Sequence, residues 1–179
     1  MNVWYSLSDI PGNEASVVTI GNFDGMHNGH KKVISTCIER AHKLGVDAVA
    51  ITFDPHPIQV HKPEVGLQLI SPLCDRLDAM GAAGLDGTLV AHYDASVYSL
   101  EADEFVYEYL VERCGAREVV VGEDFRFGRG NAGTIDTLRE LGRRYGFNVI
   151  TVTDIEAPEG RRWSSSWVRE LLAAGDVSG

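Results

Sequence analysis

Cysteine is scarce in this chain of 179 residues, and its three cysteines, Cys37, Cys74 and Cys114, lie far apart. An odd number of cysteines at these distances suggests neither a disulfide framework nor a zinc cluster. We therefore expect all three to be buried or half-buried thiols of a protein that resides in a reducing compartment.

Long apolar runs are also missing. No stretch approaches the roughly 20 residues that a membrane-spanning helix needs. The opening sequence "MNVWYSLSDIPGNE" has neither the basic flank nor the apolar core of a signal peptide. These absences predict a cytoplasmic protein without a membrane partner. A chain of this length forms one ordinary domain, which we expect to span residues 1–179.

Basic residues are outnumbered, with 16 lysines and arginines against 26 aspartates and glutamates, for a net charge of −10. Such a surface repels nucleic acid at long range, so no nucleic-acid partner is expected. A small polyphosphate can still bind where positive groups are concentrated locally. The basic residues near glycine-rich segments or near the last helix are Lys31, Lys32, Arg126, Arg129, Arg161, Arg162 and Arg169.

The segment "VVTIGNFDGMHNGH" (17–30) carries the most unusual pattern. A β-branched run stops at Gly21, and two histidines, His27 and His30, follow three residues apart. The segment holds neither the G-x-x-x-x-G-K-[ST] phosphate loop nor the G-x-G-x-x-G dinucleotide fingerprint. A zinc pair is disfavoured, because no carboxylate or cysteine stands nearby at the spacing of zinc proteases.

The physical chemistry of this segment favours an anion site. Its glycines, at positions 21, 25 and 29, let the backbone approach a ligand closely. The N-terminus of the helix predicted to follow supplies free N–H groups and the positive end of a dipole. Two imidazoles at that point can donate hydrogen bonds to phosphate oxygens. A tight turn with two surface histidines is the alternative.

Apolar β-branched runs alternate with helical patterns along the whole chain, which predicts a parallel sheet with helices on both faces. The expected α/β fold is a Rossmann-like sheet of five strands. The strands are predicted at 16–21, 47–53, 86–93, 117–122 and 147–152, and the helices at 29–44, 72–83, 101–115, 132–146 and 164–175.

Three unusual segments follow three of these strands. They are "GNFDGMHNGH" (21–30), "DPHP" (54–57) and "GEDFRFGRGNAG" (122–133). In parallel sheets the ligand crevice lies beyond the carboxyl ends of the strands. We therefore expect these segments to converge on one site.

Taken together, these segments resemble a known family. "VVTIGNFDGMHNGHKKVI", "ITFDPHP", "VVVGEDFRFGRGNAG" and "SSSWVRELLAAGDV" resemble, in order and spacing, the FMN adenylyltransferase module of bacterial bifunctional riboflavin kinase/FAD synthetases. The H-x-G-H element is shared across the wider nucleotidylyltransferase superfamily, whereas "FDPHP" and "GEDFRFG" favour the flavin branch. The resemblance covers almost the whole chain and implies the nucleotidylyltransferase fold.

The reaction implied by the resemblance converts FMN and ATP to FAD and pyrophosphate, with Mg²⁺ carried by phosphate oxygens and water and no metal ligand assigned to a side chain. The FMN phosphate would attack the α-phosphate of ATP in line. The resemblance assigns His27, His30, Ser165 and Arg169 to catalysis, Gly21, Asn22, Phe23, Asp24, Gly29, Ser164 and Ser166 to ATP binding, and Phe53, Asp54, Asp124, Phe125, Arg126 and Phe127 to FMN binding.

Several residues remain open at this stage. Asp24 either orients the histidine loop or lies close to Mg²⁺, and His56 has no assigned role. Trp163 and Trp167 depart from the family pattern, and the change at Trp167 either removes a positive contact or adds a stacking surface. The tyrosines show no catalytic spacing, so they are assigned to packing; they are Tyr93, Tyr98, Tyr107 and Tyr109.

Other functions compete with this interpretation. One is adenylyl or cytidylyl transfer to another phosphorylated substrate, and another is a flavin- and nucleotide-binding module without turnover. The sequence shows no counterpart of the C-terminal riboflavin kinase domain, so kinase activity is not expected from this chain. ATP and FMN are the expected small-molecule partners.

Overall fold

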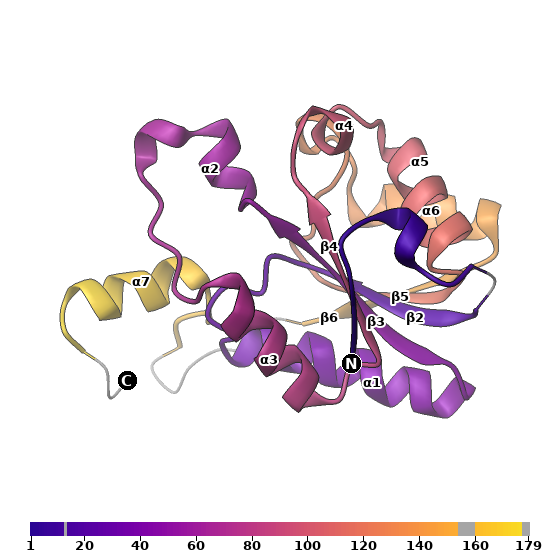
Figure 1. Ribbon diagram of the computed structural model, residues 1–179, viewed down its shortest axis with the longest axis horizontal. Helices are drawn as coiled ribbons and strands as arrows, with labels where there is room; N and C mark the ends of the chain where they lie inside the picture. The colour runs from indigo at the N-terminus through magenta and orange to yellow at the C-terminus, as the bar shows by residue number, and fades with distance from the viewer. Residues whose placement is uncertain (13, 154–159, 177–179) are drawn as a thin grey trace.

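The computed structural model describes residues 1–12, 14–153 and 160–176, and its centre is one parallel sheet (Figure 1). The strand order is β1-β4-β3-β2-β5-β6. The strands are β1 (Asn2–Trp4), β2 (Ser16–Ile20), β3 (Asp47–Asp54), β4 (Gly87–His92), β5 (Ala116–Gly122) and β6 (Asn148–Val152). The predicted α/β class and parallel sheet are confirmed.

The sheet has six strands among the described residues, so the prediction of five was wrong. The missed strand is β1, which pairs with β4 at the edge of the sheet. Three residues are too few to show a hydrophobic period, which explains the omission. The strand is held by Trp4, whose ring occupies the space above Gly87; a Cβ there would lie 2.2 Å from the indole.

Helices cover both faces of the sheet (Figure 1). On one face lie α1 (Asn28–Leu44) and α3 (Leu73–Ala83); on the other lie α5 (Ala102–Phe105), the π-helical turn η3 (Val106–Arg113) and α6 (Ile135–Tyr145). The last helix, α7 (Ser165–Ala173), lies beyond the end of the sheet. The five predicted helices are thus present, with α6 starting later because Thr134 caps it.

Short helices occupy stretches for which the sequence predicted neither a strand nor a helix. They are η1 (Leu7–Asp9), α2 (Pro57–His61), η2 (Pro63–Val65), α4 (Ala95–Tyr98) and η4 (Arg129–Asn131). Each is five residues or fewer, too short to show a helical period in the sequence. Among the described residues, no helix is both long and apolar enough to cross a bilayer.

The core lies on both sides of the central strands, and every residue of β2 is buried. One apolar cluster packs β2, β3 and β5 against η3 and α6, and the other packs them against α1 and α3. Cys37 and Cys114 are buried as expected, but Cys74 is exposed because it faces solvent in the first turn of α3.

Strand β2 is flanked by β3, the next strand in the chain, and on its other side by β5. The order in which strands are added to the sheet therefore reverses between β2 and β5. The connections that leave β2 and β5 therefore diverge and open a crevice beyond their carboxyl ends. This crevice holds the candidate site.

Candidate active site

Two cavities of about 310 Å³ each open at the carboxyl edge of the sheet. The first, which we call the histidine cavity, holds His27, His30, Ser164 and Ser165. The second, which we call the aromatic cavity, is lined mainly by rings. The two share Ile20, Gly21, Asn22 and Phe125, so they meet at the end of β2.

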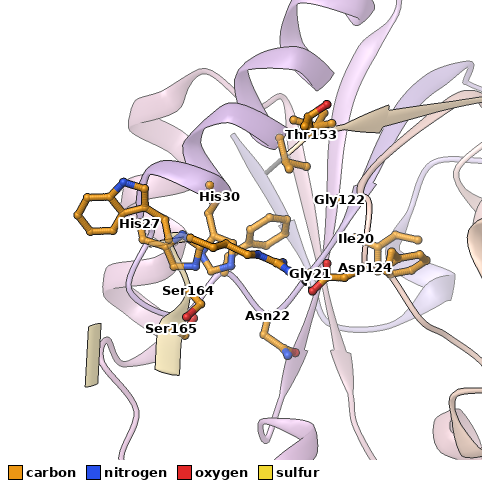
Figure 2. A pocket seen from close by; sticks show the side chains of 17 residues that line it. Ile20, Gly21, Asn22, His27, His30, Gly122, Asp124, Thr153, Ser164 and Ser165 are labelled. Atoms are coloured by element: carbon orange, nitrogen blue, oxygen red, sulfur yellow. Dashed lines mark hydrogen bonds and ion pairs between the residues drawn. The ribbon is translucent and has the colours of Figure 1, made fainter. Parts of the chain in front are cut away.

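The two histidines stand together at the start of α1. Their ring centroids are 3.7 Å apart and the planes are nearly parallel. Figure 2 shows both side chains beside Ser164 and Ser165 on the wall of the histidine cavity. A Cβ on Gly29 would lie 3.1 Å from the His27 ring. Any side chain at this position would crowd the His27 ring, so glycine suits this stacked arrangement.

Both imidazoles are neutral at physiological pH. Burial, assisted by the charge of Arg162, lowers the pKa of His27 to about 4, against a small opposing effect of Asp24. Burial, assisted by His27, lowers the pKa of His30 to about 3. Within the described part of the chain, the buried Nδ1 atoms of both rings have no hydrogen-bond partner. Buried polar atoms normally have one, so this pair points to a ligand.

Asp24 lies beneath the histidine loop, and its side chain is 1% exposed. Its carboxylate accepts hydrogen bonds from the backbone N–H groups of Ile70 (2.9 Å) and Ser71 (3.0 Å) and forms an ion pair with Arg169. Arg169 also donates from Nε to the carbonyl of Gln68, at 2.8 Å. Two roles were considered for Asp24, orienting the histidine loop or lying close to Mg²⁺. Its contacts support the first role.

The resemblance implies that Arg169 contacts phosphate, but in this structure its guanidinium contacts Asp24 and the carbonyl of Gln68. Its guanidinium is held by Asp24 and does not line the histidine cavity. Ser165 reinforces the same junction, because its hydroxyl donates to the backbone carbonyl of Asp24 at 2.9 Å. The start of α7 is therefore fastened to the loop that carries the histidines.

The serines at the start of α7 have separate positions. Ser164 caps the helix by accepting a hydrogen bond from the N–H of Trp167, at 3.2 Å. Ser164 and Ser165 line the histidine cavity. Ser166 is exposed and lies outside the cavity. Of the residues expected at ATP, Gly21, Asn22, Phe23, Gly29 and Ser164 line the cavity, whereas Asp24 and Ser166 do not.

An ion pair spans the histidine cavity. Arg162 donates from Nη2 to Asp124 at 2.6 Å, which joins the segment before α7 to the loop after β5. Both residues line the cavity. Asp124 was expected at FMN, but it lies on the histidine side of the junction.

The paired rings of the aromatic cavity come from the end of β3, the residue after β4 and the loop after β5. Phe125 and Phe127 stack with centroids 5.5 Å apart, and Phe53 meets Tyr93 edge to face at 5.5 Å. Arg126 supplies a cation to the same cavity. Of the residues expected at FMN, Phe53, Phe125, Arg126 and Phe127 line it.

Tyr93 packs against the core, as expected, and Tyr93 and Tyr98 also line the aromatic cavity. The Tyr93 hydroxyl lies 2.9 Å from Nε2 of His61. Tyr93 follows β4 directly, and a ring just past the carboxyl end of a parallel strand was the signal that sequence reasoning passed over. Tyr109 is buried in the core, in agreement with its assignment, and Tyr107 is largely exposed.

Arg76 is a second residue that the sequence did not reveal. Its side chain is wholly buried on α3 and donates to the carbonyl of Asn22 at 2.9 Å and to that of Phe53 at 3.3 Å. It also pairs with Asp54, at 3.4 Å. Asp54, expected at FMN, lines neither cavity. Arg76 shares a buried helix face with Met80, one turn on, and that is the available signal.

His56, left open by the sequence, caps α2. It is buried, and its Nδ1 accepts a hydrogen bond from the N–H of Ile58 at 3.1 Å. Burial lowers its pKa. The residue shapes the loop after β3 and does not line either cavity.

The loop after β5 contains "GRGNAG" (128–133), which matches the spacing of a dinucleotide fingerprint. Here the segment does not form the tight turn of that motif: it holds the short helix η4, and Gly133 pairs with Phe127 in an antiparallel bridge. A Cβ on Gly133 would lie 2.8 Å from the Phe127 ring. This glycine therefore serves packing against an aromatic wall residue.

Comparison with known proteins identifies the family to which this chain is similar. The sequence model of a family described as FAD synthetase matches residues 9–167. A putative bifunctional riboflavin kinase/FMN adenylyltransferase of Geobacillus thermodenitrificans is 38% identical over 93% of this chain and 86% of its own length. The bifunctional riboflavin kinase/FMN adenylyltransferase of Pseudomonas fluorescens is 37% identical over 93% of this chain but only 53% of its own length.

Among solved structures, one described as a macrolide-efflux protein from Streptococcus pneumoniae superposes with a TM-score of 0.83. It is 27% identical and covers 98% of this chain and 58% of its own. This chain therefore spans about half the length of several of the proteins it matches.

Proposed function

The chain belongs to the FAD synthetase family, and we propose that it transfers AMP from ATP to FMN, giving FAD and pyrophosphate. The observation that carries this assignment is the junction of two cavities at Gly21 and Asn22. A two-substrate transfer needs two adjoining sites whose reacting groups meet at one point. The end of β2 provides that point.

We assign ATP to the histidine cavity. Its walls present neutral imidazoles, the hydroxyl of Ser164 and the N-terminal end of α1, all of which can donate hydrogen bonds to phosphate oxygens. A site built from such donors suits a triphosphate. The unpartnered Nδ1 atoms of His27 and His30 support this assignment.

We assign FMN to the aromatic cavity. A flavin ring is large and flat, and the rings of Phe53, Tyr93 and Phe125 offer it apolar faces. Arg126 supplies a cation in the same wall for the negative charge of the FMN phosphate. The phosphate of FMN would then point toward Asn22, where the two cavities meet.

The chemical step follows from these positions. A phosphate monoester is mostly a dianion at neutral pH, because its second pKa is about 6. Its oxygen can attack the α-phosphorus of ATP without a general base. One P–O bond forms between the FMN phosphate and the AMP moiety, and the bond from the α-phosphorus to the bridging oxygen of pyrophosphate breaks. The chain has to align the two phosphates and stabilise the charge on the departing pyrophosphate.

His27 and His30 would provide that stabilisation as neutral hydrogen-bond donors. Their lowered pKa values mean that they hold no charge of their own near pH 7. A preorganised donor acts on developing charge without having to reorganise. Asp24, Ser165 and Arg169 keep the histidine loop and α7 in a fixed relation.

MgATP is the proposed form of the substrate. Mg²⁺ is commonly held through substrate phosphates and water with few protein ligands. Within the described ranges, no group of three His, Cys, Asp or Glu side chains could hold a metal ion. Asp124 is the carboxylate in the histidine cavity, and it is paired with Arg162. We therefore propose that the triphosphate carries the ion into the site.

The test is to incubate the purified chain with FMN, ATP and Mg²⁺ and to separate the flavins by chromatography. A parallel sample contains riboflavin in place of FMN. We expect FAD from FMN and no FMN from riboflavin. FMN that binds without forming FAD would favour a binding module, and transfer to other phosphorylated acceptors but not to FMN would redirect the assignment to a different substrate.

A further inference from the structure

Trp163 is a wall residue of the histidine cavity for which the proposed reaction has no stated use. The indole stands next to Trp167, with ring centroids 4.7 Å apart. Trp167 is 9% exposed, and the guanidinium of Arg161 lies 5.2 Å from its ring. Trp163 is therefore backed by a buried ring that limits its movement.

The walls of the histidine cavity divide into two kinds. The donors already assigned to the triphosphate are His27, His30 and Ser164. The apolar residues of the lining, which we call its apolar wall, are Ile20, Phe23, Val33, Phe125, Val152 and Trp163. A nucleoside triphosphate has a polar and an apolar end, so a site that binds the phosphates on its donors leaves the apolar wall for the base.

Among the aromatic residues described in this cavity, Trp163 is the best placed to meet a base. Phe23 is 1% exposed and presents little of its ring. Phe125 is shared with the aromatic cavity, where we place the flavin. Trp163 is partly exposed and directly precedes the helix cap Ser164.

The backbone of Trp163 also lies close to the start of α1. Its carbonyl oxygen is 3.7 Å from the position that a Cβ on Gly29 would occupy. The residue therefore borders the same point at which the N-terminal end of α1 is expected to bind phosphate. A base on the indole and phosphates on the donors would belong to one continuous ligand.

We propose that Trp163 is a specificity-determining residue that stacks on the purine of ATP. This inference rests on the proposed function, because it deepens the assignment of ATP to the histidine cavity. Stacking on an aromatic side chain depends on the ring area of the base rather than on its hydrogen-bonding edge. Trp163 thus favours purine over pyrimidine triphosphates and does not by itself distinguish adenine from guanine.

The test compares Trp163→Leu, Trp163→Phe and the matched control Trp4→Phe, which alters an indole at the far edge of the sheet beside Gly87. Calorimetry measures the binding of ATP, of CTP and of tripolyphosphate, which has the phosphates but no base. We expect Trp163→Leu to weaken ATP binding by roughly 5- to 150-fold. The affinity for tripolyphosphate should stay within two-fold, and the preference for ATP over CTP should shrink.

The conservative variant separates stacking from a structural role. Trp163→Phe keeps an aromatic face, so its ATP affinity should lie between those of the unaltered chain and Trp163→Leu. In the Trp4→Phe protein, ATP should quench tryptophan fluorescence and tripolyphosphate should not. Circular dichroism confirms that each variant is folded.

Three results would overturn the inference. One is ATP binding by Trp163→Leu that equals that of the unaltered chain. Another is a parallel loss of tripolyphosphate affinity, which would indicate a role in the phosphate site or in folding. The third is an unaltered chain that binds no ATP at all, and only this last result would also contradict the proposed function.

Discussion

His27 and His30 stack at a centroid distance of 3.7 Å, and burial keeps both rings neutral at physiological pH. The pair therefore acts through N–H groups and not through positive charge. This distinction matters because charged residues near the same site, such as Arg162, are already paired with carboxylates.

The neutrality of the pair predicts a pH dependence of stability. The pKa values are about 4 and about 3 in the folded chain and 6.5 in the unfolded chain. Between these values the unfolded state binds more protons, so the neutral pair weakens folding as pH falls. The penalty is absent above pH 6.5 and grows as pH falls toward 4. Urea unfolding at pH 7.0, 5.5 and 4.5 measures it.

The control for this measurement is the double variant His27→Gln/His30→Gln, which cannot titrate at these positions. The unaltered chain should lose more unfolding free energy than this variant between pH 6.5 and 4.5. Equal losses in the two proteins would mean that the histidines are not buried in their neutral form.

The ion pair between Asp24 and Arg169 predicts a large effect on stability. Asp24→Asn leaves a guanidinium, 21% exposed, without its carboxylate. Removing one partner of a buried pair costs about 3–5 kcal/mol, and the partial exposure of Arg169 places the expected loss at the low end of that range, about 3 kcal/mol. Chemical denaturation gives the value.

Asp136→Asn is the matched control, since Asp136 also pairs with an arginine, Arg139, but the two side chains are 92% and 45% exposed. Its loss should be under about 1 kcal/mol. The double variant Asp24→Asn/Arg169→Met should recover part of the stability lost in the single variant. If Asp24→Asn is as stable as the unaltered chain, the two residues do not hold α7 to the histidine loop.

Tyr93→Leu should weaken flavin binding selectively. The ring of Tyr93 lines the aromatic cavity and contacts Phe53 edge to face. Losing this ring should raise the KM for FMN by roughly 5- to 150-fold and leave the KM for ATP within two-fold, since stacking on one aromatic ring is worth about 1–3 kcal/mol. Steady-state kinetics with each substrate varied in turn provides both constants.

Tyr107→Leu serves as the control, because this tyrosine is largely exposed on the far helix η3 and lines neither cavity. Both KM values should stay unchanged in it. A rise in the KM for ATP in Tyr93→Leu would place the tyrosine at the wrong substrate.

Arg76→Met tests the buried arginine beneath the junction of the cavities. Its guanidinium donates to the carbonyls of Asn22 and Phe53, which end β2 and β3. Methionine fills similar space but leaves these acceptors without their donor, which costs about 1–3 kcal/mol for a buried group. We expect lower thermal stability and a kcat reduced about ten-fold.

Arg76→Lys, which keeps one charged donor, should recover part of the kcat. A loss of stability without a loss of kcat in Arg76→Met would show that the arginine supports the fold but not the junction.

The sequence predicted the features that local spacing determines. The glycine between the histidines, the buried central strands and the serine cap of α7 each depend on neighbours within one turn or strand. The convergence of three segments followed from the rule that parallel strands end at one edge, and the structure confirms it.

Features that depend on distant partners could not be predicted. Asp24 and Arg169 are 145 residues apart, so no local pattern reveals that they pair. The burial of Arg76 depends on its contacts with the ends of β2 and β3, which lie far from it in the sequence. Strand β1 is too short for a readable period, and only its pairing with β4 defines it.

The most direct test of the central claim is a paired measurement of FAD and pyrophosphate from FMN and ATP, in the unaltered chain and in His30→Ala. We expect equal amounts of the two products from the unaltered chain. In His30→Ala the rate should fall roughly 100- to 1,000-fold, as it does when one donor to a developing anion is removed, while FMN binding remains. An unchanged rate in His30→Ala would contradict the account.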